Sequence, residues 1–512
     1  MRLSFLEPLD RLSTSIVDGL CDPARRRRVA FILVCVYAAA WTIYGVIAKS
    51  SQDINADMAE QVVWSREPAL GYPKHPPLLA FAVKLWFTVF PLADWSFILL
   101  AAVILAAGIF LAIELCGIWL DDEKRATVPF LLAAIPFYNF LGLKFDQNGT
   151  LIPIWALAML AFMHSLETRR PGWSILTGIA AAAAMLIKYW SGFLLAALAI
   201  AALADRRRGA YLRSPAPWLV ALVFSVAMLP HIIWLFHEHF PPLTWITTRR
   251  SSYAIADFSR SLGEYSFGTL GYVTGALALV TFVIRPPPEA VRDSWFAIDP
   301  ARRAATLLFW TPLLLPILVA AVMRVNLLSL WNTAAFNLLP VMVLATPLVK
   351  VSRSTAKQVA SIVIAITAIV VAVSPIVALA KLMTGVENDA AYARLAAVAV
   401  ENTWRETTAA PLRLIAGPFG LATSAAFYMT DAPSTYADFS DYLSPWITPT
   451  RIAREGIAII CPADDTPCVD HMAVLSAAGP HGQRTEVTLA RHWLGFAGAA
   501  KRFVITTIPP RP

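Results

Sequence analysis

The stretch RRRRVAFILVCVYAAAWTIYGVIAKS, residues 25–50, places four arginines directly before a run of about twenty mostly apolar residues. A helix of that length crosses the hydrocarbon core of a bilayer. Arginine clusters beside a span favour the cytoplasmic side. Residues 1–28 lack the apolar core and small-residue cleavage site of a signal peptide. We therefore expect a cytoplasmic N-terminus followed by an anchor that is retained.

The whole composition extends this interpretation. Hydrophobic residues make up 58% of the 512 residues and charged residues only 15%, with a mean hydropathy of +0.61. Soluble domains carry about 25% charged residues, so the sequence predicts an α-helical polytopic membrane protein. Eleven apolar stretches are predicted to span, within a membrane domain of residues 29–382: 29–48, 96–118, 127–143, 150–166, 174–187, 191–204, 218–236, 267–284, 305–323, 333–349 and 358–382.

The basic loops set the orientation. Clusters of Lys and Arg at 121–125, 167–173, 205–213, 285–303 and 350–357 all fall on the side of the N-terminus when eleven spans are counted. The apolar segment 77–92 would reverse this pattern if it spanned. We therefore predict that it lies in the outer interface with Lys84 reaching the headgroups, inside a first periplasmic loop of residues 49–95.

The cytoplasmic clusters also account for the net charge of +8, so no nucleic-acid partner is predicted.

Residues 383–512 have a different character. From residue 384 onward there are 10 Lys and Arg against 12 Asp and Glu, a net charge of −2. Short β-like runs (LRLIAG, AAFYM, GIAIIC, RTEVTLARHW and RFVITTI) indicate a small α/β domain, which an odd number of spans places in the periplasm. Cys461 and Cys468 frame CPADDTPC there and could form a disulfide, with two free thiols as the alternative.

Several charged residues break the positive-inside pattern. The cations on the outer side are Lys74, Lys144, Lys188, Arg249, Arg250, Arg260 and Arg324. Each alone is compatible with a solvated side chain, but together they suggest an anion site. Asp57 and Glu60 are three residues apart and would share one side of a helix, either as a solvated face or as a proton acceptor. Carboxylates and cations on one face suit a base for a hydroxyl and a site for a departing phosphate.

Four motifs in a fixed order carry a resemblance to a known family. They are WSREPALGYPKHPPLL at 64–79, FDQNG at 145–149, LIKYWSG at 186–192 and PHIIWLFHEHFPPLTWI at 230–246. In this order, after the carboxylate at 57, the chain over about residues 30–350 resembles the bacterial membrane glycosyltransferases related to protein O-mannosyltransferases. Within that group it looks closest to the lipid A aminoarabinose transferases and the rhizobial lipopolysaccharide galacturonosyltransferases.

The resemblance implies a GT-C fold, a polyprenyl-phosphate-linked sugar donor and an acceptor reached from the periplasmic face of the inner membrane. By the resemblance, Asp57 matches the catalytic Asp, while Met58 stands where the family usually has Glu, leaving Glu60 as the candidate second carboxylate. The resemblance further carries family positions onto His75, Asp146, Lys188, Tyr189 and Trp331. The candidates for binding the donor phosphate combine these matches with the outer cations: Lys74, His75, Lys188, Tyr189, Arg249, Arg250 and Arg324.

Other residues keep two interpretations. His231, His237 and His239 could ligate a metal or form an interfacial belt with aromatic residues. Trp234, like Trp331, could stack on a sugar or anchor the interface. No cofactor is required by the chemistry, and a divalent metal at the carboxylates stays open.

The sequence thus predicts an enzyme, a lipid-phosphate-sugar-dependent glycosyltransferase that acts on lipid A, the lipopolysaccharide core, another glycolipid or a protein. Direct displacement by the acceptor would invert the anomeric centre. A transporter or flippase of lipid-linked sugars is the alternative, although the inverted repeats and broken midplane helices typical of transporters are not evident in the sequence.

Overall fold

The computed structural model describes residues 7–248, 255–295, 299–385, 391–477 and 483–511. The chain forms two compact units. The first consists of Met1–Thr42, His75–Leu78 and Leu99–Val371, and the second of Ile43–Lys74, Leu79–Ile98 and Ala372–Pro512. The predicted boundary at residue 383 stays a prediction, because the unit that holds the C-terminal residues also includes much of the predicted first loop.

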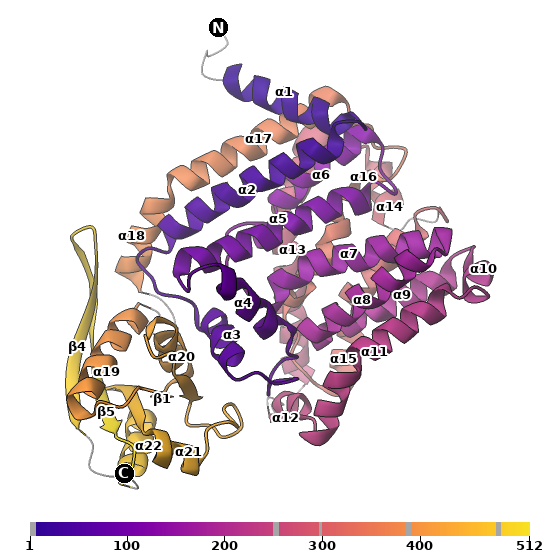
Figure 1. Ribbon diagram of the computed structural model, residues 1–512. Helices are drawn as coiled ribbons and strands as arrows, with labels where there is room; N and C mark the ends of the chain where they lie inside the picture. Colours follow the sequence, from indigo (N-terminus) through magenta and orange to yellow (C-terminus); the bar gives the residue numbers. More distant parts are fainter. Residues whose placement is uncertain (1–6, 249–254, 296–298, 386–390, 478–482, 512) are drawn as a thin grey trace. The chain divides into compact units, whose positions relative to one another are not determined.

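Long apolar helices dominate the chain (Figure 1). Within the described residues, seven segments are long and apolar enough to cross a membrane. They are α2 (Arg26–Ala48), α5 (Asp94–Cys116), α7 (Gln147–Thr168), α11 (Ala216–His237), the joined α13 (Ile255–Leu279) and η4 (Val280–Ile284), α15 (Arg303–Met323) and α17 (Arg353–Ala372).

Shorter apolar helices account for three further predicted spans: α8 (Pro171–Ile187), η3 (Tyr189–Ser191) with α9 (Gly192–Ala204), and η5 (Ser329–Leu338) with α16 (Leu339–Leu344). The predicted span 358–382 is divided between α17 and the short helix α18 (Ser374–Thr384), and the segment 77–92, predicted to lie in the interface, forms α4 (Leu78–Val89). The stretch 127–143 is different, because its helix α6 (Asp122–Ala133) ends before Pro136 and continues as turns around η2 (Pro136–Tyr138). The total of eleven spans remains a prediction.

In the first unit, α7 packs on α8, α8 packs on α11, and α9 packs on α15. Small residues allow the close α8–α11 crossing: a Cβ at Gly178 would lie 2.8 Å from the carbonyl oxygen of Val220. The remaining elements of this unit are α1 (Glu7–Cys21), α10 (Arg208–Leu212), α12 (Pro241–Thr248) and α14 (Pro288–Trp295).

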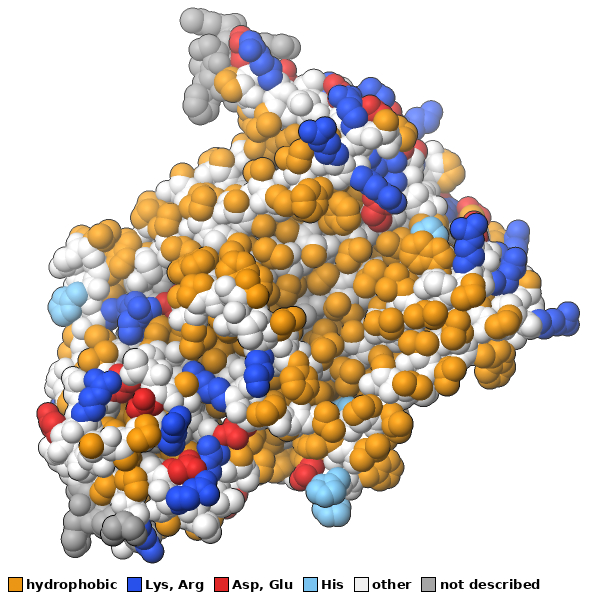
Figure 2. Space-filling model, in the orientation of Figure 1, with side chains coloured by type: hydrophobic (Ala, Val, Ile, Leu, Met, Phe, Trp, Pro, Cys, Tyr) orange, Lys and Arg blue, Asp and Glu red, His pale blue; other side chains and the backbone are white. Residues whose placement is uncertain are grey.

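Orange hydrophobic side chains cover much of the visible surface in Figure 2, and many of them lie over the helices. For example, Trp218 and Phe236 on α11 are 69% and 66% exposed. A helix that exposes large apolar side chains to its surroundings suits a lipid environment better than water.

The second unit contains a five-stranded sheet of order β2-β1-β3-β5-β4. The strands β1 (Leu414–Gly417), β2 (Ser434–Ala437) and β3 (Ile457–Pro462) are parallel, whereas β4 (Arg484–Trp493) and β5 (Phe496–Ile508) form an antiparallel hairpin joined to β3. The helices of this unit besides α4 and α18 are α3 (Ala56–Arg66), α19 (Ala393–Thr407), α20 (Phe419–Tyr428), α21 (Pro449–Glu455) and α22 (Thr466–Ala477).

Two observations refine the predicted strands. The run AAFYM belongs to α20 and not to a strand, so that prediction was wrong. It continues an alanine-rich helix whose Leu421, Ala422 and Ala425 pack into the core, and alanine favours helix. No strand was predicted at 434–437, where β2 pairs in parallel with β1. The predicted α/β character of the domain is confirmed.

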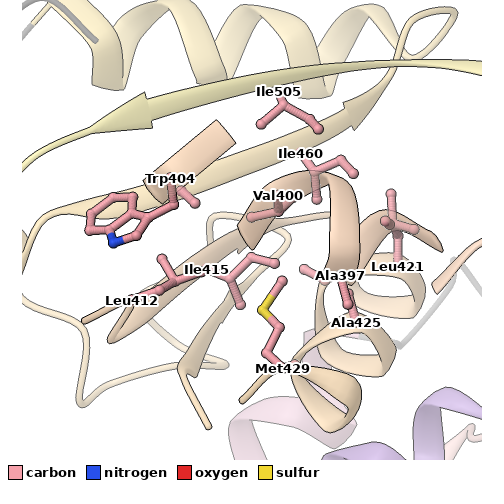
Figure 3. Close-up of a cluster of buried hydrophobic side chains, with 14 of the residues drawn as sticks. Ala397, Val400, Trp404, Leu412, Ile415, Leu421, Ala425, Met429, Ile460 and Ile505 are labelled. Carbon is pink, nitrogen blue, oxygen red and sulfur yellow. The ribbon is translucent and has the colours of Figure 1, made fainter. Parts of the chain in front are cut away.

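The core of the second unit lies between α19, α20 and the sheet (Figure 3). Trp404, Ile415, Ile460 and Ile505 are almost fully buried in it. Val63 of α3 belongs to the same cluster, so the helix from the predicted first loop shares the hydrophobic core of the sheet domain. A second hydrophobic cluster includes residues of β3 and α22. Within it, Cys461 and Cys468 form the disulfide that the sequence suggested, with Cα atoms 5.7 Å apart.

Candidate functional site

Helix α3 carries Asp57 and Glu60, the two candidate catalytic carboxylates of the predicted first loop. Asn55 caps the helix and its side chain accepts the Asp57 backbone N–H at 3.0 Å. Asp57, in the first helical turn, is half-buried, whereas Glu60 is buried. A carboxylate in the first turn is favoured by the helix dipole. Asp57 and Glu60 were predicted to share one side of a helix. Consistent with this, the negative charge of Asp57 raises the pKa of Glu60.

Lys74 returns to this helix through a tight loop. Tyr72 stacks on Trp64 with ring centroids 4.6 Å apart and donates its hydroxyl hydrogen to the Trp64 carbonyl at 2.8 Å. This contact places the Lys74 ammonium 2.5 Å from Glu60 Oε1. The same ammonium lies 4.3 Å from the ring centroid of Phe419, the first residue of α20. The pair is therefore enclosed by aromatic rings and shielded from water.

Burial controls the charge of this pair. Only 9% of the Glu60 side chain and 13% of the Lys74 side chain are exposed. Burial raises the pKa of the Glu60 carboxyl to about 7, and the positive charge of Lys74 opposes the rise. Glu60 can therefore change charge near neutral pH, which makes it a candidate for proton chemistry.

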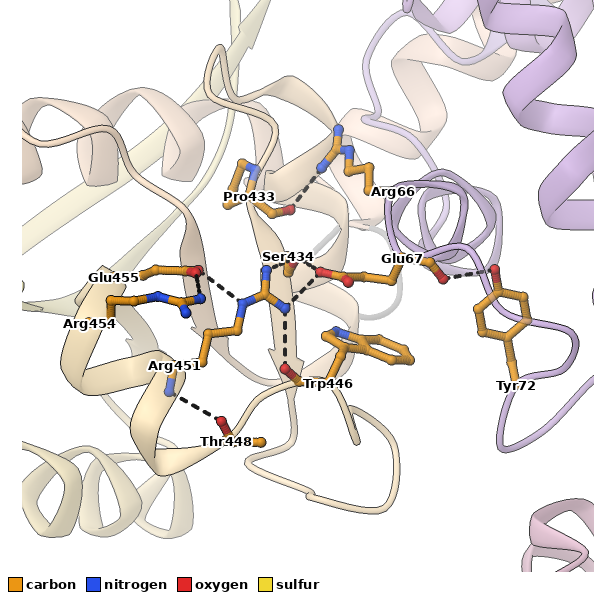
Figure 4. A network of polar contacts seen from close by, with 10 residues as sticks. All are labelled: Arg66, Glu67, Tyr72, Pro433, Ser434, Trp446, Thr448, Arg451, Arg454 and Glu455. Carbon is orange, nitrogen blue, oxygen red and sulfur yellow. Dashed lines mark hydrogen bonds and ion pairs between the residues drawn. The ribbon is translucent and has the colours of Figure 1, made fainter. Parts of the chain in front are cut away.

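The end of α3 is fixed to the sheet domain by a polar network (Figure 4). Arg451 of α21 forms an ion pair with Glu67 at 2.8 Å, and Ser434 of β2 also donates to Glu67. Arg66 donates to the carbonyls of Ala426 and Pro433 at 3.0 and 2.9 Å. These contacts, together with Val63 in the core, hold the helix that carries Asp57 and Glu60 in one position.

A second cluster lies in the first unit, where α8 ends and α9 begins. Lys188 caps the end of α8 in an extended conformation, before the short helix η3. Ser191 fixes this break, because its hydroxyl donates to the Ala184 carbonyl at 2.9 Å and accepts the Trp155 indole N–H at 3.1 Å. The break turns the chain out of the helix at the lysine.

Lys188 is linked to Asp146 by one intervening side chain. Its ammonium donates to Asn148 Oδ1 at 2.7 Å, and Asn148 Nδ2 donates to Asp146 Oδ2 at 3.0 Å. Asp146 caps α7, with its Oδ1 accepting the Gly149 N–H at 2.9 Å. The carboxylate therefore has a structural role at the helix start and also orients the amide that holds the lysine.

Aromatic rings cover this cluster. The Lys188 ammonium lies 4.4 Å from the ring centroid of Trp331, and Trp190 contacts Trp331 edge to face at 4.8 Å. The Trp190 indole N–H is buried and has no hydrogen-bond partner among the described residues. A buried donor without a partner is costly, and a ligand acceptor would satisfy it.

Tyr189 extends the cluster toward α11. Its hydroxyl shares a hydrogen bond with His231 Nε2 at 2.9 Å, and His231 stacks on Trp234 with ring centroids 5.7 Å apart. His231 is buried, whereas His237 and His239 are exposed. Within the described part of the chain, no group of three or more His, Cys, Asp or Glu residues could hold a metal ion.

The other predicted residues are more dispersed. His75 follows Lys74 and is half-buried, and Arg324 ends α15 and is exposed. Arg260 forms an exposed ion pair with Glu264 at 3.0 Å. Arg249 and Arg250 lie outside the described residues.

Sequence reasoning missed Asn148, Trp190 and Phe419 as parts of these clusters. The first two belong to the quoted motifs FDQNG and LIKYWSG, whereas Phe419 carries no local signal.

Comparisons with known proteins place this geometry in context. A family model described as dolichyl-phosphate-mannose-protein mannosyltransferase matches residues 74–234. The lipopolysaccharide core galacturonosyltransferase RgtB of Rhizobium johnstonii is 28% identical over 269 residues, which cover 51% of this chain and 52% of that protein. The matched region therefore spans about half the length of this relative.

The fold has a solved counterpart. The crystal structure of ArnT from Cupriavidus metallidurans, bound to undecaprenyl phosphate, superposes with a TM-score of 0.60 and 14% sequence identity, covering 93% of this chain and 97% of that chain. The predicted GT-C fold and the resemblance stated from the motifs are confirmed by these matches. Both sequence matches are to glycosyltransferases, and the fold match together with the long apolar helices supports a multi-pass membrane protein with the GT-C fold.

Proposed function

We propose that this GT-C membrane glycosyltransferase moves a sugar from a polyprenyl-phosphate donor to a hydroxyl group of an envelope acceptor, with inversion at the anomeric carbon. The acceptor is lipid A, the lipopolysaccharide core, another glycolipid or a protein, and the reaction takes place at the periplasmic face of the inner membrane. The observation that carries the proposal is the Lys188 cluster, in which a half-buried cation is held by Asn148 within the matched family segment.

The Lys188 cluster suits a phosphate. The cation is oriented by Asn148 and covered by Trp331, while the Trp190 N–H has no partner among the described residues. An ammonium and a free indole N–H are donors, which fits an anion with several acceptor oxygens. Undecaprenyl phosphate, the ligand in the crystal structure of ArnT, belongs to the same chemical class as the proposed donor carrier. Tyr189 and Arg324 are further candidates for the same role.

Asp57 is assigned as the general base. In the proposed step, the acceptor oxygen forms a bond to the anomeric carbon while the bond from that carbon to the phosphate oxygen breaks. The acceptor proton passes to the Asp57 carboxylate, and the polyprenyl phosphate leaves with the electron pair. The half-buried position of Asp57 in the first turn of α3 keeps it accessible for this transfer.

Glu60 on α3 and Lys74 in the loop that follows it are assigned a role in setting the electrostatics around Asp57. Glu60 is occupied by the Lys74 ammonium at 2.5 Å, so this carboxylate does not fit the role of a divalent-metal ligand. The negative charge of Asp57, three residues away, adds to the raised pKa of Glu60, and the positive charge of Lys74 opposes it. No step of the proposed mechanism uses a metal.

A reconstituted system tests the proposal. The full chain is placed in proteoliposomes with polyprenyl-phosphate-linked hexoses, hexuronates or pentoses that carry a radiolabel in the sugar, and with envelope glycolipids as acceptors. We expect label in the acceptor fraction for one class of donor. The Asp57→Asn protein is the matched control, because it keeps the side-chain shape but lacks the base.

Two results would contradict the proposal. Label that crosses the bilayer but stays on the polyprenyl carrier would support a transporter of lipid-linked sugars instead. Equal transfer by the wild type and the Asp57→Asn protein would remove the general-base assignment.

A further inference from the structure

The β4–β5 hairpin has two distinct halves. Residues 503–508 of β5 are buried in the core of the second unit, whereas residues 496–502 and the facing part of β4 are exposed or half-buried. In Figure 1 the yellow hairpin extends well beyond the rest of the sheet. Two strands alone do not bury a hydrophobic core, so the outer half is expected to be hydrophilic unless it contacts something else.

The tip is apolar instead. Residues 492–500, HWLGFAGAA, contain no Asp, Glu, Lys or Arg. Leu494 is 77% exposed and Phe496 is 52% exposed. Large exposed apolar side chains on a projecting element indicate a contact surface.

The turn residue is unusual. Trp493 pairs with Phe496, so Leu494 and Gly495 form a two-residue turn. Both have positive φ, 47° for Leu494 and 85° for Gly495. The first position of such a turn favours Asn, Asp or Gly, and a leucine there costs free energy. The exposed apolar side chain is thus kept at a position that local geometry disfavours.

The tip is attached beside the end of a membrane helix. The Trp493 indole N–H donates to Ser50 Oγ at 2.7 Å, and Ser50 lies two residues beyond α2, which is one of the seven candidate spans. Arg491 donates to the Ser50 carbonyl at 3.0 Å and pairs with Asp53. These contacts place the base of the tip beside the C-terminal end of this candidate span.

The last apolar helix supplies an independent contact. A Cβ at Gly498 would lie 3.1 Å from Leu382 Cδ1, so β5 passes directly along α18. Ser51 donates to the Ala378 carbonyl at 2.7 Å, which places the middle of α18 beside the end of α2. The hairpin therefore runs along α18 from Leu382 toward the C-terminal end of α2.

We propose that the hairpin tip inserts Leu494 and Phe496 into the lipid interface at the C-terminal end of α2. Its partner is the bilayer itself, because the apolar tip is attached beside the C-terminal end of α2, a candidate membrane span. Trp493 suits the interfacial level, and Lys501 and Arg502, which follow the apolar run, suit the phosphates of anionic headgroups. This proposal does not depend on the transferase assignment.

Site-specific fluorescence tests the proposal on the full chain. The background is Cys35→Ala, since Cys35 is exposed while Cys21 and Cys116 are buried. The polarity-sensitive dye NBD is attached at Leu494→Cys, or at Phe496→Cys in case the turn tolerates one change poorly. The matched control is Val474→Cys on α22, which is 72% exposed. Each protein is reconstituted into vesicles of phosphatidylcholine and phosphatidylglycerol with and without acyl-chain nitroxide lipids.

We expect a blue-shifted emission maximum at 494 and 496 and loss of most of the emission with nitroxide lipids, with neither change at 474. The proposal is overturned if both tip probes behave like the 474 probe. It is also overturned if the blue shift depends on the protein-to-lipid ratio and is not quenched by nitroxide lipids, because the tip would then bind a second copy of the chain.

Discussion

Replacing Lys74 by methionine tests the electrostatics of the α3 site. The ammonium lies 2.5 Å from Glu60 Oε1, and both side chains are nearly buried. At this distance the attraction is about 7 kcal/mol for an effective dielectric constant of about 20. Much of that energy offsets the cost of removing two charges from water. Removal of one partner leaves the other charge buried and unpaired, which destabilises proteins by about 3–5 kcal/mol.

The loss should depend on pH. Burial raises the pKa of Glu60 to about 7 in the folded protein, above the ordinary value of 4.5. A carboxyl with a raised pKa contributes a stabilisation that is complete below pH 4.5 and lost as the pH rises through about 7. In Lys74→Met the opposing charge is absent, so the pKa moves higher and the loss continues above pH 7. The stability difference from wild type should grow by up to about 1.4 kcal/mol per pH unit there.

Thermal unfolding in lipid nanodiscs, followed between pH 6 and pH 9, measures this difference. Lys84→Met on α4 is the matched control, since Lys84 is exposed. The Glu60→Gln/Lys74→Met double variant removes both charges and should regain most of the stability lost by Lys74→Met. The reasoning fails if Lys74→Met and Lys84→Met unfold at the same temperature at every pH. It also fails if the destabilisation of the double variant equals the sum of the effects of Glu60→Gln and Lys74→Met.

The remaining predictions concern catalysis and topology. Asp57→Asn should lower turnover by roughly 10²–10⁴-fold with unchanged thermal unfolding, as general-base catalysis implies; normal turnover would exclude this role. Lys188→Met should raise the donor concentration required by about ten- to a hundredfold, the effect of losing a charge-assisted hydrogen bond, while Lys84→Met should not; equal donor kinetics for the two variants would contradict it. Alkaline phosphatase fused after Pro512 should be active, whereas activity of a cytoplasmic reporter at that position would refute the predicted orientation.

Much of the fold could be predicted from hydropathy alone. Long apolar runs specify helices whatever their neighbours, so the predicted spans coincide with helical segments in nearly every case. The exception at 127–143 shows the limit of that reasoning, because Pro136 ends the helix inside an apolar run. Short strands were harder: the four residues of β2 are set by pairing with β1, which lies earlier in the chain.

The site residues were predicted in part, for a related reason. Lys188 and Asp146 were named from motifs forty-two positions apart, and the structure joins them through Asn148. Helical spacing correctly placed Asp57 and Glu60 on one helix. The same spacing could not reveal that Lys74 neutralises Glu60, because that contact depends on a loop closed by Tyr72 on Trp64.

The sheet domain is best understood through the burial of α3. Most residues of this short helix are buried, including Met58, Val62 and Val63, so it needs protein on nearly every side. The sheet domain provides this protein environment, because Val63 packs into its core and Arg451 binds Glu67 at the end of the helix. Along the sequence, the membrane spans separate residues 383–512 from the first loop, and the hydropathy of these spans differs from that of both regions. Packing joins the two, since an 11-residue helix that carries buried charge is not stable alone in water. The C-terminal domain is therefore part of the structure that positions the candidate base.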